Sequence, residues 1–223
     1  MIPWVHLDTA PVPNGGSLRL MRRGTEFSIM LGDNELMNSR LSGSEEALAE
    51  LGCADAIARE APHVLIGGLG MGFTLRAALS ILPPGARVTV AELVPAVERW
   101  ARGPVADIFA GSLDDGRVRV AIDDVLNVMR EGGPFDAVLL DVDNGPDGLT
   151  SESNATLYDA HGLGIALRSL KPRGVLAVWS AHPSPRFAQR LRQGGFAVEE
   201  ARVRARRGGR GAKHVVWVAR RPG

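Results

Sequence analysis

The sequence contains little of what marks secreted, membrane-spanning or metal-binding proteins. It has one cysteine, Cys53, among 223 residues, so no internal disulfide can form and we expect a reducing, cytoplasmic location. Nowhere do about 18 apolar residues follow one another, and no basic stretch precedes an apolar one at the start, so we expect neither a membrane span nor a secretory signal. The five histidines lack metal-ligand spacing, so no metal site is expected.

The chain also lacks a strong net charge, because 26 basic and 25 acidic side chains leave a formal charge of +1. Such a balance creates no overall field that attracts nucleic acid or an anionic membrane. One basic cluster stands near the C-terminus. Its alternating arginines suit the exposed face of an edge strand, while binding of RNA or another acidic partner is the alternative interpretation. The cluster comprises Arg202, Arg204, Arg206, Arg207, Arg210 and Lys213.

The hydrophobic content, 45% of the residues, is enough for one substantial core. Residues 1–17 contain three prolines and are interpreted as an irregular lead-in. The runs 17–24 and 26–32 then predict a small antiparallel hairpin unit. A helical stripe begins at Ser44, which we expect to cap that helix, and continues past Cys53, which is interpreted as a small buried hydrophobic residue. We therefore divide the chain into a lead-in with a hairpin unit, 1–43, and a main domain, 44–223.

The main domain alternates short apolar runs with helical segments. Continuous apolar strands separated by helices predict an α/β fold in which helices cover both faces of a mostly parallel sheet. A helix and a final antiparallel hairpin follow the fifth strand, which is unlike a plain dinucleotide dehydrogenase. The expected strands are 63–68, 87–93, 117–122, 135–142 and 174–181, the hairpin strands are 196–205 and 213–221, and the expected helices are 73–82, 95–103, 124–132, 154–170 and 185–195.

A glycine-rich loop joins the first of these strands to the following helix. Gly68, Gly70 and Gly72 stand where ligands meet such sheets, and missing side chains let the backbone approach a ligand. Phe73 occupies the position of the third glycine of the dinucleotide pattern G-x-G-x-x-G, so a pyrophosphate cradle is disfavoured. A tight turn without a ligand is the alternative.

Acidic residues follow the next strands at the same edge of the sheet. Glu92 lies twenty residues after Gly72, at the end of the second strand, where a carboxylate can accept hydrogen bonds from ribose hydroxyls. Asp123 and Asp124 follow the third strand. Asp124 could accept from an adenine amino group while the Val125 amide faces the ring, or one of the two aspartates could cap the next helix.

The fourth strand ends in the run Asp141-Val142-Asp143-Asn144-Gly145-Pro146. Asp141 and Asp143 are two residues apart and would point the same way if the strand persists. Such carboxylates could bind a sulfonium ligand or an amine, or act as a general base toward an ammonium group. Turn formation by the Asp-Asn-Gly-Pro sequence is the alternative role for Asp143.

Taken together, these segments resemble the nucleotide half of spermidine synthases, over about residues 60–182. The resemblance lies in VLIGGLGMGFTLRAAL, VTVAELVPAVERWAR, DDGRVRVAIDDVLNVM, FDAVLLDVDNGP and SLKPRGVLAVWS. It implies the Rossmann-like class I methyltransferase fold, with a mostly parallel seven-stranded sheet, and an enzyme that binds S-adenosylmethionine or its decarboxylated form. It also implies a homodimer and a small-molecule substrate, with a polyamine as one candidate.

The resemblance carries over to single positions. It implies that Gly68, Gly70 and Gly72 line the cofactor, that Glu92 holds the ribose and that Asp124 reads the adenine. It further implies that Asp141 approaches the methionine-derived amine.

The chain departs from the family pattern in three segments. Met71 stands where the family has an aspartate in the glycine loop, and Asn144 stands where it has the presumed proton acceptor. Asp143 could substitute for that acceptor if the loop shifts. Of the family's Tyr-His-Glu run before the domain, only the glutamate survives, as Glu45 in Gly43-Ser44-Glu45.

Three functions remain open from the sequence. The first is a transferase that positions an amine against the carbon beside a sulfonium, moving an aminopropyl group from the decarboxylated cofactor or a methyl group from the intact one. The second is a nucleotide-binding protein without turnover. A nicotinamide dehydrogenase is third. His182, which follows the fifth strand, is a further candidate for substrate contact or an ordinary loop residue, and Trp179 is expected in the core.

Overall fold

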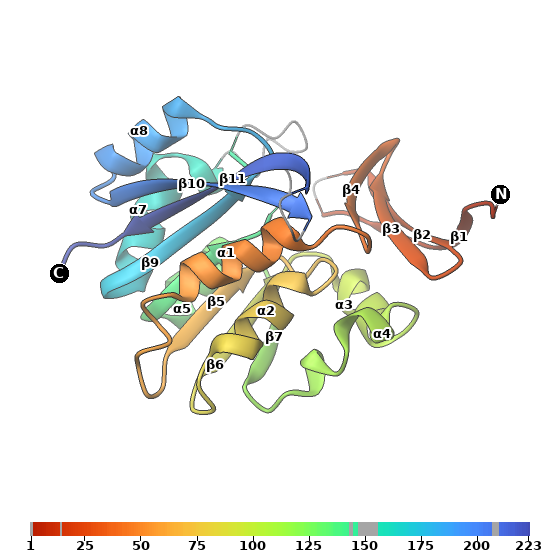
Figure 1. Ribbon diagram of the computed structural model, residues 1–223, viewed down its shortest axis with the longest axis horizontal. Helices are drawn as coiled ribbons and strands as arrows, with labels where there is room; N and C mark the ends of the chain where they lie inside the picture. The colour runs from red at the N-terminus through yellow and green to blue at the C-terminus, as the bar shows by residue number, and fades with distance from the viewer. Residues whose placement is uncertain (1, 14, 143–144, 147–155, 207–209) are drawn as a thin grey trace.

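The computed structural model describes residues 2–13, 15–142, 145–146, 156–206 and 210–223. It forms two sheets, and the larger one confirms the predicted α/β fold (Figure 1). Its seven strands lie in the order β10-β11-β9-β8-β5-β6-β7. Strands β7, β6, β5, β8 and β9 pair in parallel, whereas β11 is antiparallel to β9 and to β10. The strands are β5 (His63–Gly67), β6 (Arg87–Glu92), β7 (Val118–Ile122), β8 (Phe135–Leu140), β9 (Leu170–Ser180), β10 (Ala197–Arg206) and β11 (Arg210–Arg220).

Helices cover both faces of this sheet, as the alternating pattern predicts. One face packs against α1 to α4, and the other against α5, α7 and α8 (Figure 1). Helix α1 approaches the sheet so closely at Gly52 that a Cβ atom on this residue would overlap the side chain of Leu139. The helices are α1 (Gly43–Cys53), α2 (Phe73–Ile81), α3 (Pro95–Arg102), α4 (Ala106–Phe109), α5 (Val125–Gly132), α7 (Ala160–Ser169) and α8 (Pro185–Gln193), with a 3₁₀ turn at Ser112–Asp114.

The smaller sheet has four antiparallel strands, β1 (Val5–Pro11), β2 (Ser17–Arg23), β3 (Glu26–Leu31) and β4 (Asn34–Asn38). The predicted hairpin is confirmed as β2 and β3, but the irregular lead-in is wrong, because Val5–Pro11 pairs with β2 along its length. The prolines did not prevent this, since β1 is an edge strand that needs hydrogen bonds on one side only.

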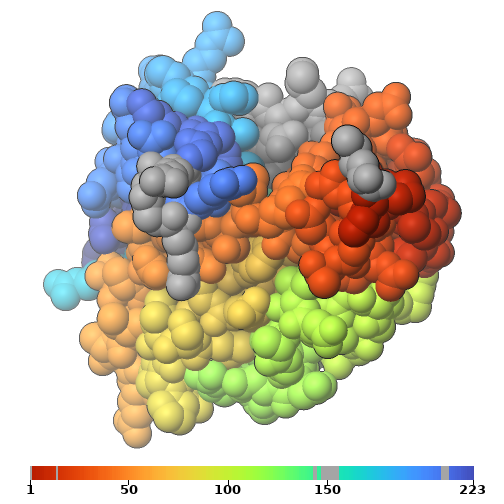
Figure 2. All heavy atoms as spheres, turned by 45° about the vertical axis from the view of Figure 1, so that its right-hand side comes forward, coloured from red at the N-terminus to blue at the C-terminus, as the bar shows by residue number. Residues whose placement is uncertain are grey.

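The small sheet packs against the helices that follow β6 (Figure 2). Ala10 and Leu18 are buried in the same core as Val97 and Trp100 of α3. The Trp100 indole also donates a hydrogen bond of 2.7 Å to the Asp8 carboxylate. The N-terminal sheet is thus fixed beside the carboxyl end of the large sheet.

Several side chains lie in the environments that the sequence predicts for them. Cys53 is buried, which raises the pKa of its thiol to about 12 and confirms a small hydrophobic residue. Trp179 is buried in the core, as expected. The alternating Arg202, Arg204 and Arg206 side chains are exposed on β10, the edge strand of the sheet. Within the described residues, no helix is both long and apolar enough to cross a membrane.

The cap assigned to Ser44 is wrong. Helix α1 begins at Gly43, with Ser42 at the N-cap position and no side-chain capping bond. Ser44 lies inside the first turn, and its hydroxyl is turned toward other side chains.

Candidate functional site

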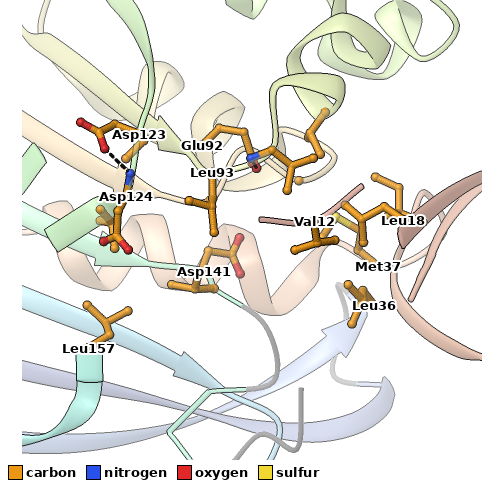
Figure 3. Close-up of a pocket in the computed structure, with 18 of the residues that line it drawn as sticks. Val12, Leu18, Leu36, Met37, Glu92, Leu93, Asp123, Asp124, Asp141 and Leu157 are labelled. Carbon is orange, nitrogen blue, oxygen red and sulfur yellow. Dashed lines mark hydrogen bonds between the residues drawn. The ribbon is translucent and has the colours of Figure 1, made fainter. Parts of the chain in front are cut away.

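A pocket lies where the carboxyl ends of β5, β6, β7 and β8 face the N-terminal sheet (Figure 3). This is the edge at which parallel sheets of this class bind ligands. The central sheet and its loops contribute Gly68, Gly70, Ala91, Glu92, Leu93, Val94, Val97, Asp123, Asp124, Val125, Leu126, Asp141, Val142 and Leu157, and the N-terminal sheet with its first loop contributes Val12, Leu18, Ile29, Leu31, Leu36 and Met37.

The glycine loop supplies backbone to one wall of this pocket. Gly68 and Gly70 line it with positive φ angles of 94° and 50°, a conformation that glycine adopts without strain. A Cβ atom on Gly68 would overlap the backbone carbonyl of Asp141. Gly72, also predicted to line the cofactor, instead packs against the Phe109 ring and does not belong to the lining.

Glu92 ends β6 inside the pocket and is 8% exposed. Its Oε2 atom accepts a hydrogen bond of 3.0 Å from the Leu69 amide, and its Oε1 atom accepts one of 2.8 Å from the Val94 amide. These bonds join the glycine loop to the turn after β6. A carboxylate oxygen can accept more than one hydrogen bond, so the geometry is compatible with a ribose contact as well.

Asp123 and Asp124 lie at the opposite end of the pocket from the N-terminal sheet (Figure 3). Asp124 caps α5 by accepting a 2.7 Å hydrogen bond from the Leu126 amide, so the capping alternative is confirmed for this residue. Asp123 accepts from the Asp124 amide at 2.7 Å and from Asn127 at 3.0 Å. Val125 also lines the pocket, against Gly67. Adenine recognition by Asp124 and Val125 remains a prediction.

Asp141 directly follows β8 and lies between the Asp124 end of the pocket and the N-terminal sheet (Figure 3). The buried Thr74 hydroxyl donates a hydrogen bond of 2.6 Å to its Oδ2 atom. Burial nevertheless raises the pKa of Asp141 to about 6. Asp143, the other candidate for proton transfer, and Asn144, which stands at the position of the family's proton acceptor, lie outside the described residues.

Glu45, absent from the predicted site, lies beside Asp141. The Thr74 hydroxyl is 3.4 Å from the Glu45 backbone carbonyl and 2.6 Å from Asp141. Burial raises the pKa of Glu45 to about 7, and the neighbouring Asp141 carboxylate contributes to the shift. The sequence did contain a signal for this residue, because Glu45 is the one residue that matches the family's Tyr-His-Glu run.

The pocket is strongly acidic. Among its described lining residues, Glu92, Asp123, Asp124 and Asp141 are acidic and none is basic. Within the residues that the structure describes, neither Asp141 nor Glu45 forms an ion pair with a basic side chain. The described residues also include no cluster of three potential metal ligands from His, Cys, Asp and Glu. The arrangement therefore favours a ligand that carries positive charge.

The rest of the lining is apolar and comes largely from the N-terminal sheet. Met37 lies against Gly70, where a Cβ atom would be 3.1 Å from its sulfur. Met71, which stands at the family's aspartate position, is 3% exposed and packs in the core rather than in the pocket. His182 is exposed after β9.

Comparison with known proteins identifies relatives with matching sequence and fold. No protein-family model matches the chain. Polyamine aminopropyltransferases of Mycobacterium tuberculosis and Mycobacterium bovis are each 34% identical to it over 154 residues. The match covers 64% of this chain but 28% of each relative, so most of those longer proteins has no counterpart in the match.

Solved structures show the same fold over nearly the whole chain. Spermidine synthase from Thermotoga maritima matches 97% of this chain and 72% of its own, with a TM-score of 0.74 and 16% identity. A spermidine synthase in complex with the transition state analogue AdoDATO gives a TM-score of 0.73 at the same coverage and identity. A probable spermidine synthase from Corynebacterium glutamicum gives 0.63 at 17% identity, matching 97% of this chain and 79% of its own.

Proposed function

For this chain, which is related in sequence to polyamine aminopropyltransferases and has the class I methyltransferase-like fold of spermidine synthases, we propose transfer of an aminopropyl group. The donor is decarboxylated S-adenosylmethionine, and the acceptor is an aliphatic amine such as a polyamine. The observation that carries the proposal is an acidic, glycine-walled pocket at the carboxyl edge of the parallel sheet.

Each part of the donor has a counterpart among the residues. Gly68 and Gly70 leave room for close approach of the ligand, and we assign Glu92, which also lines the pocket, to the ribose hydroxyls. Asp124 and Val125 are assigned to the adenine, and Asp141 to the amino group of the tail. A sulfonium and an ammonium group carry positive charge into a pocket whose described charged groups are carboxylates.

The charge of the pocket distinguishes the two forms of the cofactor. Intact S-adenosylmethionine carries a carboxylate that would enter a lining with four acidic and no basic described side chains. Like charges at close range disfavour binding. The decarboxylated form lacks this group, so aminopropyl transfer is preferred here to methyl transfer.

The chemistry is a displacement at the carbon beside sulfur. The acceptor nitrogen forms a bond to that carbon while the carbon–sulfur bond breaks, and its electron pair stays on sulfur to give methylthioadenosine. The protein contributes mainly by holding nitrogen and carbon in line and by removing a proton from the ammonium group. We further propose a cytoplasmic location, because the cysteine usage fits a reducing compartment, and a homodimer, as the resemblance implies.

Calorimetry with methylthioadenosine tests the nucleoside site. We expect binding to the wild-type protein and at least tenfold weaker binding to Glu92→Gln, because a charge-assisted hydrogen bond contributes about 1.5–3 kcal/mol. Glu98→Gln, which alters a carboxylate of α3 paired with Arg102, is the matched control and should bind as the wild type does. Equal affinity of Glu92→Gln and the wild type would reject the assignment.

Mass spectrometry tests the reaction. After incubation with putrescine and decarboxylated S-adenosylmethionine, we expect an aminopropylated product and methylthioadenosine. A methylated product from intact S-adenosylmethionine would instead support the methyltransferase. Nucleoside binding without either product would support a binding protein without turnover.

A further inference from the structure

A chain of hydrogen bonds leads away from the carboxylates at the pocket edge. Ser44, which is 1% exposed, donates a hydrogen bond of 2.7 Å to Glu45 Oε2. Its hydroxyl oxygen is also 2.9 Å from Nδ1 of His214, a residue of β11 that lies 170 positions later in the sequence. The Trp179 ring packs edge-on against His214 with ring centroids 4.9 Å apart. The fold therefore brings β11 to the first turn of α1 and holds the Ser44 hydroxyl between two proton-exchanging groups.

Glu45 is placed to act together with Asp141. Asp141 lines the pocket and Glu45 does not, so the pair straddles the pocket edge. The two carboxylates repel each other, and the described residues give neither one a cationic partner. An ammonium group between them would supply the missing positive charge.

We propose that Glu45, oriented by Ser44 and His214, accepts the proton of the acceptor amine and thereby supplies the function that Asn144 cannot provide. The proposal rests on the aminopropyl transfer proposed above. It assigns the acceptor side of the site to an element, α1, that the predicted site did not include. Glu45 is the catalytic residue, and Ser44 and His214 are positioning residues.

The proton balance follows from the single hydrogen of the Ser44 hydroxyl. While Glu45 is ionised, Ser44 donates to it and His214 Nδ1–H donates to Ser44. The ammonium group gives one proton to Glu45, and the freed nitrogen attacks the carbon beside sulfur. Protonated Glu45 then passes its proton to Ser44, which passes its own to Nδ1 of a His214 tautomer protonated at Nε2. Loss of the Nε2 proton to solvent restores neutral His214 and ionised Glu45. The product is a secondary ammonium group that keeps its two remaining hydrogens, so one proton leaves per turnover.

The groups that face this chain set its proton affinity. Glu45 is next to Asp141 and to Glu46 of its own helix turn. Behind Ser44, burial lowers the pKa of His214, and the nearby His182 lowers it further. A neutral imidazole can accept a proton at one ring nitrogen and release one from the other, as the relay requires.

The first experiment measures putrescine binding to protein saturated with methylthioadenosine. We expect Glu45→Gln to weaken putrescine binding at least tenfold while methylthioadenosine binding changes less than about twofold. Glu50→Gln removes the same charge from an exposed position of α1 and should leave both affinities near wild type. Failure of the wild type to bind methylthioadenosine would reject the proposed function. Normal nucleoside binding with putrescine affinity unaffected by Glu45→Gln would reject the role of Glu45.

The second experiment measures how kcat depends on pH. Glu45→Gln should lower kcat at pH 7 about 100-fold, within the usual range for general base catalysis. Its kcat should then rise about tenfold per pH unit and approach the wild-type value at about pH 9, because the fraction of free amine grows as the pH nears the amine pKa of about 10. The exposed-site variant Glu50→Gln should follow the wild type. Parallel profiles for Glu45→Gln and the wild type would show that Glu45 takes no proton.

Ser44→Ala tests the positioning role. The Ser44 hydrogen bond lowers the pKa of Glu45, so its loss should move the pH at which wild-type kcat levels off to a higher value. A residue with only a packing role would change folding or KM without moving that pH. An unchanged pH dependence in folded Ser44→Ala would remove Ser44 and His214 from the mechanism.

Discussion

Strand β8 has a buried aspartate near its start and a second aspartate just after its end, and the two are treated in opposite ways. Asp136 contacts Arg59 at 2.6 Å, Lys171 at 2.8 Å and the His63 amide at 2.6 Å. Asp141 receives one hydrogen bond from Thr74 and has another carboxylate nearby. Arg59 and Lys171 balance the charge of the Asp136 carboxylate inside the protein, so Asp136 stabilises the fold. The Asp141 carboxylate lacks such compensation within the described residues, which is what a site for a cationic ligand requires.

Asp136→Asn should give the largest effect on stability. The Asp136 side chain is fully buried, so its replacement leaves Arg59 and Lys171 without their carboxylate and removes a strong acceptor. Both cations are about one-third exposed, so water recovers part of the loss, and we expect a destabilisation of about 2–4 kcal/mol. Denaturant unfolding measures it. Asp55→Asn, at an exposed ion pair with Arg220, is the control. An equally small loss of unfolding free energy in both variants would show that Asp136 does not stabilise the fold more than an exposed ion pair does.

Gly68→Ala should have the next largest effect, because Gly68, directly after β5, packs against the backbone of Asp141 at the end of β8. The residue has a φ of 94°, and the added methyl group would overlap the Asp141 carbonyl, which belongs to the backbone and cannot rotate away. We expect a loss of at least about 2 kcal/mol in unfolding free energy. Methylthioadenosine binding should fall as well. Gly116→Ala, where a Cβ atom meets nothing within 4 Å, provides a control for adding a methyl group in open space.

Asp141→Asn should change stability in the opposite direction from Asp136→Asn. A carboxyl group whose pKa is raised by folding binds protons more tightly in the native state, so the contribution of Asp141 to stability falls as pH rises from about 4 through about 6. The amide avoids this loss and can still accept from Thr74. We therefore expect Asp141→Asn to be more stable than the wild type at pH 8, by about 1 kcal/mol.

The pH dependence separates this effect from better packing. The advantage of Asp141→Asn should shrink toward zero at pH 4, where the wild-type carboxyl group is protonated, and thermal unfolding at the two pH values measures it. Glu50→Gln, an exposed change on α1, should show no such trend. Aminopropyl transfer should be lost in Asp141→Asn even though the fold is more stable. Equal gains in stability at pH 4 and pH 8 would instead show that the charge of the Asp141 carboxylate does not destabilise the fold.

These contrasts also mark how far the sequence predicts the molecule. Asp141 could be found because it ends an apolar strand at a known ligand-binding edge, and Glu92 for the same reason. The relation of Ser44 to His214 could not, since it depends on the docking of β11 beside α1 across 170 residues. The sequence pattern made Ser44 a cap, because local rules describe a helix end without the strand that packs against it.

The N-terminal strand was missed for a related reason. Prolines in a short segment indicate irregular structure when they are considered alone. Strand β1 forms because β2 offers it a partner and because Trp100 of α3 binds Asp8. Tertiary contacts therefore determine the structure of a segment whose local sequence favours a loop. The same contacts help to position the apolar wall of the pocket.

Gly70→Ala should give the smallest of these effects. Its φ of 50° lies in the left-handed helical region, where an alanine costs about 1–2 kcal/mol. The added methyl group would meet the Met37 sulfur at 3.1 Å rather than backbone, and a thioether side chain can move. Nucleoside affinity should fall only a few fold by calorimetry. The double variant Gly70→Ala with Met37→Ala should recover that affinity if side-chain contact causes the loss, whereas no recovery would assign it to the backbone of the glycine loop.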